Sequence, residues 1–379
     1  MKNRFERALF AAAAAVLSAV PCLAQAPEVS GTVLTWASAH VSGPADPILG
    51  FRYLPAIAFE KALPGGAALR FEASLNVFGT VSFPSHGDVG TSVRARLYRG
   101  WVRYATPRFE ARIGRQRLDF GSASILRPLM WFDRIDPRDP LQITDGVTGL
   151  LLKYTFRSNA NVWLWGLYGN EDPKGWELYP TARRRPEFGG RVQLPVPKGE
   201  IALTYHRRRA DTPPCVPNVC GAFPEDRIGV DGKWDVGIGL WFEGTLVRAN
   251  TSSLPLPFRR ALTVGADYTF AVGNGLHVLG EHFLLRDSET AFGVGQGMKI
   301  SAASLSYPLS VLDALSGIFY YDWENRRFYR FLNWRRTYDR WSFHVIGFWN
   351  PETFDIYRPG TVGASFGGKG IQVMAVFNY

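Results

Sequence analysis

The feature that most constrains the fold is a two-residue alternation of apolar and polar side chains. It recurs along most of the chain, while helical periodicity is hard to find. In residues 69–77, for example, Leu, Phe, Ala, Leu and Val alternate with Arg, Glu, Ser and Asn, and residues 188–194, 200–208 and 262–270 follow the same pattern. Because successive side chains of a strand point to opposite faces, each segment predicts a β-strand with one apolar and one mostly polar face.

Alternation alone fits a soluble β-sandwich, whose apolar faces meet, or a membrane barrel, whose apolar faces meet lipid. Segment length favours the barrel, because the segments cluster near about ten to twelve residues, the length that a tilted strand needs to cross a membrane. Aromatic residues near the predicted strand ends, at 98–104, 163–168 and 320–323, are expected to form girdles at the membrane interfaces.

The connections between the segments also favour the barrel, because they alternate in length. Short connections fall at 63–66, 157–160, 195–199, 272–275 and 338–339, and long ones at 38–50, 79–91, 115–146, 170–186, 208–226, 249–258, 287–298 and 350–369. Only 324–325 is short where a long connection is due. Short periplasmic turns opposite long outer loops are typical of outer-membrane barrels.

We therefore predict an all-β fold, a transmembrane antiparallel up-and-down β-barrel of about 18 strands with both termini on the periplasmic side. The predicted strands are 29–37, 51–60, 67–78, 92–106, 108–115, 147–157, 160–169, 187–195, 198–208, 226–235, 237–248, 259–271, 275–286, 299–307, 313–323, 326–337, 340–349 and 370–379. Three of them, 92–106, 160–169 and 326–337, alternate poorly. In one register or the other, Arg99, Arg103, Arg330 or Arg335 would face lipid.

The N-terminus has the form of a secretory signal peptide. Basic residues at Lys2, Arg4 and Arg7 precede an uncharged run, 8–20, and a stretch of small residues that ends at Ala24. We expect residues 1–24 to be cleaved and residues 25–379 to form the barrel. Export to an oxidising compartment also predicts a disulfide between Cys215 and Cys220, a close pair in a Pro-rich segment.

The C-terminal strand points to the bacterial outer membrane. Residues 370–379 read GIQVMAVFNY and end on an aromatic residue. One face of this strand carries Ile371, Val373, Ala375, Phe377 and Tyr379. This ending resembles the C-terminal signal that the barrel-assembly machinery recognises, so that machinery and the outer-membrane lipids are expected partners.

The chain is basic, with 43 Lys and Arg against 33 Asp and Glu and a formal net charge of +10. An exported protein meets little nucleic acid, so no nucleic-acid partner is expected. Lipopolysaccharide phosphates and small anionic or polar solutes fit the charge better.

The longest connection carries a recognisable motif set: Gly114-Arg115-Gln116, Phe120-Gly121, Asp136-Pro137, Asp139-Pro140 and Asp145-Gly146. Over about forty residues (113–154) it resembles the strand-loop-strand signature of the alginate-export type porins and of related bacterial outer-membrane porins. The resemblance implies a monomeric barrel of about eighteen strands, a loop folded toward the lumen and an arginine-rich constriction.

Charged residues in and before this connection are candidates for that constriction. They are Arg94, Arg96, Arg112, Arg115, Arg117, Arg127, Arg134, Arg138, Asp119 and Asp133. Arginine rings select anions because a low-dielectric wall concentrates their field on a narrow aqueous path, and the guanidinium group suits carboxylates. The alternative is that the wall charges pair across the lumen. The acids available for this are Glu60, Glu72, Glu110, Glu187, Glu200, Glu243, Asp231 and Asp267.

These observations predict a porin for passive diffusion of small polar solutes, with a preference for anionic, carboxylate or uronate-like ones. No enzymatic activity, cofactor or metal is expected, since the cluster of His277, Glu281 and His282 lacks the spacing of a zinc site. Three alternatives stay open: a substrate-specific polysaccharide export or uptake channel, a barrel-embedded hydrolase with a serine and a histidine in contact, and a surface adhesin.

Overall fold

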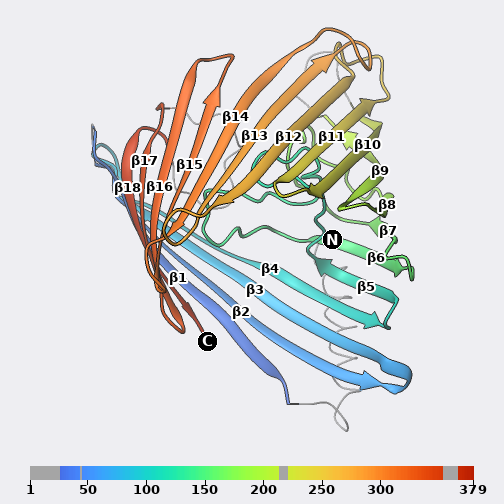
Figure 1. The fold of residues 1–379 in the computed structure, drawn as a ribbon, viewed down its shortest axis with the longest axis horizontal. Helices are drawn as coiled ribbons and strands as arrows, with labels where there is room; N and C mark the ends of the chain where they lie inside the picture. Colours follow the sequence, from blue (N-terminus) through green and yellow to red (C-terminus); the bar gives the residue numbers. More distant parts are fainter. Residues whose placement is uncertain (1–25, 43–44, 213–220, 353–365) are drawn as a thin grey trace.

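The computed structural model describes residues 26–42, 45–212, 221–352 and 366–379, and these form one closed antiparallel barrel of 18 strands (Figure 1). Closure comes from β1, which pairs with β2 on one side and with β18 on the other. The predicted fold class is therefore confirmed, including the strand number. The expected signal peptide and the expected Cys215–Cys220 disulfide lie outside the described residues.

The observed strand bounds differ from the predicted ones by only a few residues, mostly at the outer ends. In chain order the strands are β1 (Glu28–His40), β2 (Ile48–Leu63), β3 (Ala67–Ser82), β4 (Gly90–Ala105), β5 (Phe109–Gln116), β6 (Val147–Thr155), β7 (Asn161–Leu167), β8 (Glu187–Val196), β9 (Gly199–Asp211), β10 (Ala222–Asp235), β11 (Gly239–Ala249), β12 (Phe258–Phe270), β13 (Leu276–Ser288), β14 (Gln296–Pro308), β15 (Asp313–Asp322), β16 (Arg327–Thr337), β17 (Trp341–Trp349) and β18 (Lys369–Asn378). A 3-10 turn, η1 (Pro64–Gly66), joins β2 and β3. Within the described residues, no helix is long and apolar enough to cross a bilayer.

The two faces of each strand meet different surroundings. On β9, Leu203 and Tyr205 are exposed on the outside, whereas Thr204 and His206 are buried on the inside. A closed barrel has no free strand edge, so an apolar outer face can contact hydrocarbon. The inner faces are free to carry polar and charged residues.

A β-bulge explains the poor alternation of the predicted strand at 92–106. The register between β3 and β4 shifts after Ser74, which pairs with Arg99, while Leu75 pairs with Leu97. Tyr98 is thus the extra residue, and a bulge of one residue restores the inward direction for the arginines that follow it. Arg99 and Arg103 therefore face the lumen together with Arg94 and Arg96, not lipid.

The arginines of β16 divide between the two faces. Arg335 shares the inner face with the buried Phe331 and pairs in register with His344 of β17. Arg330 faces outward near the end of the strand, with its guanidinium 4.6 Å from the centre of the Phe328 ring. An outward arginine near the membrane interface destabilises a barrel by only about 0 to 1 kcal/mol.

The expected aromatic girdles are only partly present. Tyr104, Tyr168 and Trp323 are exposed on the outside, but Trp101, Trp165 and Tyr320 are buried. Trp165 shows the reason. Its ring stacks on the ring of Phe120, a residue of the connection between β5 and β6, with 5.6 Å between the ring centres. Aromatic side chains of the wall thus pack against a loop inside the barrel.

The barrel has one end with short turns and one with long loops. The start of β1 and the C-terminal residue lie at the short-turn end, where Gly31 and Tyr379 exchange backbone hydrogen bonds of 3.2 and 3.1 Å. The connection between β15 and β16 remains short, as the sequence indicates. The short-turn end corresponds to the periplasmic side of outer-membrane barrels.

Candidate pore and its charged walls

The connection between β5 and β6, residues 117–146, folds into the barrel, and we call it the inward loop. Its apolar side chains are buried against the inner wall: Leu118, Phe120, Ile125, Leu126, Leu129, Met130, Trp131, Phe132 and Ile135. Its entry depends on glycine, because Gly114 and Gly121 have φ values of +122° and +110°. A Cβ on Gly114 would lie 2.2 Å from the carbonyl oxygen of Gly100. The expected inward-folded loop is thus confirmed.

Two wall carboxylates hold the inward loop by its backbone. Glu281 of β13 accepts hydrogen bonds from the N–H groups of Ser124, Ile125 and Leu126 at 2.6, 3.0 and 2.6 Å. Glu243 of β11 accepts from Ala123 at 2.9 Å and from Leu129. Such charge-assisted hydrogen bonds to backbone N–H groups are about twice as strong as neutral ones, so the loop is firmly attached at these points.

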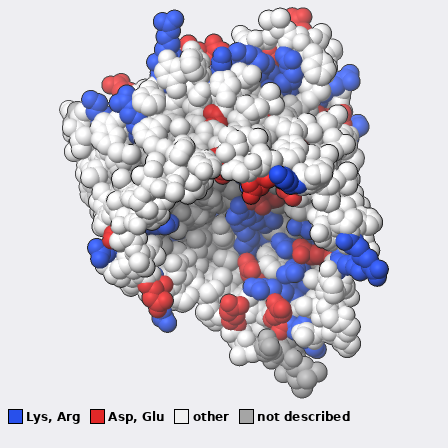
Figure 2. Space-filling view, viewed as in Figure 1, with Lys and Arg blue, Asp and Glu red and all other residues white. Residues whose placement is uncertain are grey.

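Opposite this attachment, the inner face of β3–β6 forms what we call the basic wall. Its cations are Arg70, Arg94, Arg96, Arg99, Arg103, Arg112 and Lys153. Figure 2 shows charged side chains gathered along one side of a hollow in the molecule, over the region of these strands in Figure 1. Two of these arginines are partly hydrated, with 46% of the Arg96 side chain and 35% of the Arg103 side chain exposed, whereas Arg99 is buried.

Cations outnumber acids on the basic wall, where Glu72 and Glu110 face seven cations. Arg70 also lies within ion-pair distance of Glu28 and Glu60. Glu110 is shared, since it lies 3.1 Å from Arg103 and 2.8 Å from Arg112. Lys153, in register with Glu110, has its ammonium 3.7 Å from the centre of the Trp163 ring. Arg94 has no hydrogen-bond or ion-pair partner among the residues that the structure describes. This wall therefore presents unbalanced positive charge to the lumen.

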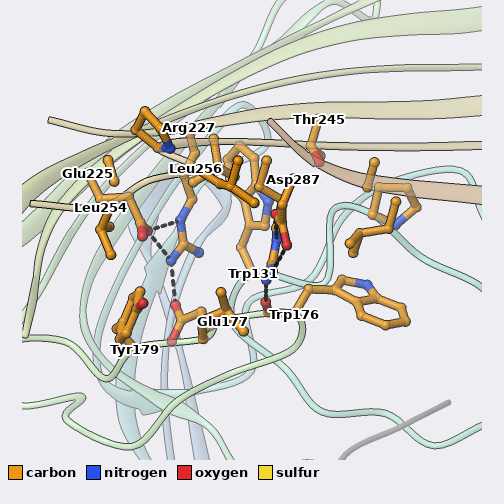
Figure 3. A pocket seen from close by; sticks show the side chains of 18 of the residues that line it. Trp131, Trp176, Glu177, Tyr179, Glu225, Arg227, Thr245, Leu254, Leu256 and Asp287 are labelled. Atoms are coloured by element: carbon orange, nitrogen blue, oxygen red, sulfur yellow. Dashed lines mark hydrogen bonds and ion pairs between the residues drawn. The ribbon is translucent and has the colours of Figure 1, made fainter. Parts of the chain in front are cut away.

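The inner face of β8–β13, which we call the paired wall, has the opposite character. A second connection, residues 168–186, also lies over it and contributes Glu177. Arg227 lies 2.7 Å from both Glu177 and Glu225, and Arg208 binds the same two acids at 3.1 and 2.6 Å. All four side chains are buried, so their charges neutralise one another and face no solvent. Figure 3 shows Arg227 between its two acids.

The rest of the paired wall is neutralised in the same way. Arg191 and Asp231 pair at 2.5 Å, Arg259 and Asp287 at 2.6 Å, and Lys174 lies 3.7 Å from Glu187. Burial alone would raise the pKa of Glu177, but Arg208, Lys174 and Arg227 together hold this pKa below its usual value. The sequence-based alternative, in which wall charges pair, thus describes this half of the lumen.

A pocket lies between the paired wall and three connections: the inward loop, residues 168–186 and the connection between β11 and β12. Its empty volume is about 670 Å³, including the part open to solvent. Its apolar lining includes Trp131, Trp176, Leu254, Leu256 and Leu285 (Figure 3). The charged groups at its edge already have protein partners, so the pocket adds apolar surface but no available charge.

The structure divides the predicted constriction residues into two groups. Arg94, Arg96 and Arg112 lie on the basic wall, and Arg96 lies 3.8 Å from Asp145 of the inward loop. Three of the four arginines of the inward loop already have an acidic partner within the loop. The loop pairs are Arg117 with Asp119, Arg127 with Asp133, and Arg138 with Asp136. Arg115 lies at the end of β5, and Arg134 is half-buried in the loop.

Burial corrects the expectation for Arg127 and Asp133. Both are buried under the loop, and burial raises the pKa of Asp133 although Arg127, at 3.2 Å, partly offsets this. The structure also adds Arg70, Arg103 and Lys153, which are not among the candidates, and it places Arg99 on the same wall as a buried residue bonded to the Thr144 carbonyl. For Arg103 the bulge at Tyr98 hid the inward direction, whereas Arg70 belonged to a cleanly alternating strand and could have been included.

Two serine–histidine contacts bear on the hydrolase alternative. On the inner face, Ser342 lies 3.4 Å from Nε2 of His344, whose Nδ1 lies 3.3 Å from Oδ1 of Asn333. On the outer face, Ser301 lies 2.9 Å from Nδ1 of His282. No group of three or more His, Cys, Asp or Glu residues within the described ranges is arranged to hold a metal ion.

No known protein family matches the sequence, and no curated protein is detectably similar to it. Solved structures do match the fold. Acinetobacter baumannii OccAB4 is 9% identical, with a TM-score of 0.56 over 95% of this chain and 99% of that one. OccAB1 of the same organism is 11% identical, with a TM-score of 0.55 over 93% and 96%. OmpT, an outer membrane protein of Vibrio cholerae, is 12% identical, with a TM-score of 0.51 over 94% and 100%.

These likenesses concern the fold, and they agree with what the structure shows by itself. A closed barrel of 18 strands with an apolar outer face is the architecture of an integral outer-membrane protein.

Proposed function

We propose that this barrel is an outer-membrane diffusion channel that favours small solutes bearing a carboxylate. The observation that carries the proposal is the contrast between the two halves of the lumen. The paired wall is neutralised and covered, while the basic wall keeps partly hydrated arginines beside the hollow of Figure 2. Cations at a water-filled passage with low-dielectric walls raise the local concentration of anions.

The basic wall suits a carboxylate in geometry as well as in charge. A guanidinium group offers a planar pair of N–H donors that matches the two oxygens of a carboxylate. Arg103 and Arg112 share one acid, Glu110, so part of their hydrogen-bonding capacity is available to a passing solute. Arg94 and Arg96 extend the positive charge toward the outer mouth.

Proteoliposome uptake tests the proposal. The purified protein should admit gluconate faster than glucose, a neutral sugar of similar size, and should conduct in planar bilayers. The variant R103S/R112S should lose much of the gluconate advantage. The matched control R330S/R336S changes two arginines on the outer face of β16 and should keep it. Absence of both conductance and uptake would contradict the proposal that the barrel is a channel. Equal uptake rates for gluconate and glucose would contradict the anion preference.

The finer expectation, a channel of the alginate-export type, rests on the motif between 113 and 154. The steric need for Gly114 and Gly121 accounts for two of the motif positions but also suits any loop that enters a barrel. An oligouronate should therefore block the open-channel current at lower concentration than a neutral oligosaccharide of equal length. Equal block by the two would leave only the general channel.

A barrel-embedded hydrolase is the second candidate, favoured by the contacts among Ser342, His344 and Asn333. Their distances of 3.4 and 3.3 Å lie beyond the range of good hydrogen bonds, so this candidate ranks below the channel. It requires phospholipid or small-ester turnover that survives purification and disappears in His344→Ala. The channel proposal expects the same absence of turnover in both proteins.

A further inference from the structure

The outer face of β11–β14 carries a row of cations next to the long loops. These residues, which we call the outer cluster, are Arg248 of β11, Arg260 of β12, Arg286 of β13 and Lys299 of β14. They face outward because their sequence neighbours face inward: Val247, Ala261 and Leu285 line the internal pocket, and Ile300 is buried in the internal apolar cluster. In Figure 2, basic side chains gather along the upper edge of the molecule, where these strands end. The outer cluster is therefore separate from the lumen and its basic wall.

The strand register places the four cations close together. Arg260 lies directly opposite Arg286. Arg248 pairs with Phe258, two residues from Arg260, and Lys299 pairs with Leu284, two residues from Arg286. Residues directly opposite on one face are about 5 Å apart, and diagonal neighbours about 7 to 8 Å apart. The four side chains can thus contact one ligand.

The protein itself supplies little negative charge to this cluster. Within the described part of the chain, Arg286 alone of the four has a carboxylate within ion-pair distance, Glu324 at 2.9 Å. Arg260 donates to the carbonyl of Gly293, and Lys299 has its ammonium 5.5 Å from the Trp323 ring centre. Like charges directly opposite each other on a sheet are unfavourable, so an external anion would stabilise the pair of Arg260 and Arg286.

An apolar surface adjoins the outer cluster on the side that faces the middle of the membrane. The next outward residues on β12, Leu262 and Val264, are 43% and 48% exposed, and Leu246 and Leu284 flank them on β11 and β13. A ligand that fits both parts has phosphate groups above several acyl chains. The long-loop end lies in the outer leaflet, where the amphiphile of this form is lipopolysaccharide.

We propose that the outer cluster binds the phosphates of lipid A while its acyl chains cover the apolar surface below. Arginine guanidinium groups bind phosphate oxygens in pairs, and lysine adds a point charge. Each basic residue near an anionic membrane surface contributes about fivefold to binding. This site does not depend on solute passage through the lumen.

The test compares lipid A with two phosphates, its dephosphorylated form with identical acyl chains, and phosphatidylglycerol. Each lipid is titrated into the purified barrel in detergent, and bound lipid is counted by native mass spectrometry. Wild type should prefer the phosphorylated lipid A over both other lipids. The variant R260S/R286S/K299S should bind it about 100-fold more weakly. The control R108S/R157S/R340S removes three exposed cations from the short turns at the opposite end and should bind as wild type does.

Several outcomes would overturn the site. One is equal binding of phosphorylated and dephosphorylated lipid A, because the cations would then contribute nothing. Another is equal binding of phosphatidylglycerol, because any anionic lipid would then suffice. A third is unchanged affinity of the triple variant for phosphorylated lipid A, with its folding checked by heat-dependent gel mobility. This result would show that other residues bind the lipid. If the triple variant does not fold, Arg260→Ser alone should weaken binding about fivefold.

Discussion

The two walls of the lumen contain the same residue types but differ in how the chain covers them. On the paired wall, only 1% of the Arg208 side chain and 3% of the Arg227 side chain are exposed. The covering connection 168–186 supplies one of their two acids, Glu177, and β10 supplies the other, Glu225. On the basic wall, Arg96 and Arg103 remain partly hydrated because the inward loop is attached to β11 and β13 and reaches the basic wall with its last residues, Thr144 and Asp145. The comparison teaches that loop placement decides whether a wall charge supports the fold or remains available to a solute.

The two walls should differ most in how much stability the protein loses when one cation is removed, and the loss should be largest for a buried cation of the paired wall. Arg227→Ala leaves Glu177 and Glu225 buried with Arg208 and, for Glu177, Lys174 as the remaining counter-charges. Breaking a buried ion pair in this way lowers the free energy of unfolding by about 3 to 5 kcal/mol. Guanidinium unfolding of the detergent-solubilised barrel measures this change. A loss below about 1 kcal/mol would mean that the paired wall is not desolvated as the structure indicates.

A smaller loss is expected where the wall holds the loop backbone. Glu281→Gln removes the charge that accepts three loop N–H groups, and we expect about 2 to 3 kcal/mol of lost stability. Thr263→Val removes one hydrogen bond, from the Thr263 hydroxyl to the Leu126 carbonyl, and should cost about 1 kcal/mol. Limited proteolysis should cut residues 117–146 faster in the Glu281 variant than in the Thr263 variant. Equal cutting in both variants and wild type would show that these contacts do not hold the loop.

The pH dependence of stability offers a third comparison. The pKa of Glu177 lies below its ordinary value of 4.5, so its ionised form stabilises the fold above that pH, and this stability is lost as the pH falls through the lowered pKa. Wild type should therefore lose unfolding free energy on acidification below about pH 4.5 more steeply than Glu177→Gln. Parallel curves for the two proteins would contradict the ion pairing of Glu177.

The smallest effect on stability is expected on the basic wall. Arg103→Ala removes a partly exposed ion pair with Glu110, and such pairs contribute about 0 to 1 kcal/mol. The same substitution should reduce uptake of gluconate, whereas the main effect of Arg227→Ala should be the lower free energy of unfolding. A loss of several kcal/mol in Arg103→Ala would erase the distinction between the two walls.

The strands could be predicted because barrel alternation repeats along the chain, and the inward direction of Arg94 and Arg96 followed from it. The bulge at Tyr98 could not be predicted, because an extra residue reverses the inward and outward sets without a change in composition. Hence Arg99 and Arg103 seemed to face lipid in one register.

The division of the lumen into two walls was also hidden from sequence reasoning. It depends on where the inward loop lies, and loops have no periodicity that reveals their contacts. Trp165 illustrates this, because its position near a strand end suggested the membrane interface, whereas it packs on Phe120 and donates a hydrogen bond of 3.2 Å to His206. Likewise, the pairing of Arg127 with Asp133 follows from the fold of the loop and not from the spacing of the two residues.

The most direct test of the account is the reversal potential of single channels in a potassium chloride gradient, measured on wild type and two double variants. The account predicts anion selectivity in wild type and a clear loss of it in R96S/R112S. It predicts unchanged selectivity in R191M/D231L, which replaces a neutral buried pair by apolar residues. Cation selectivity in wild type, or an equal effect of the two variants, would contradict the assignment of selectivity to the basic wall.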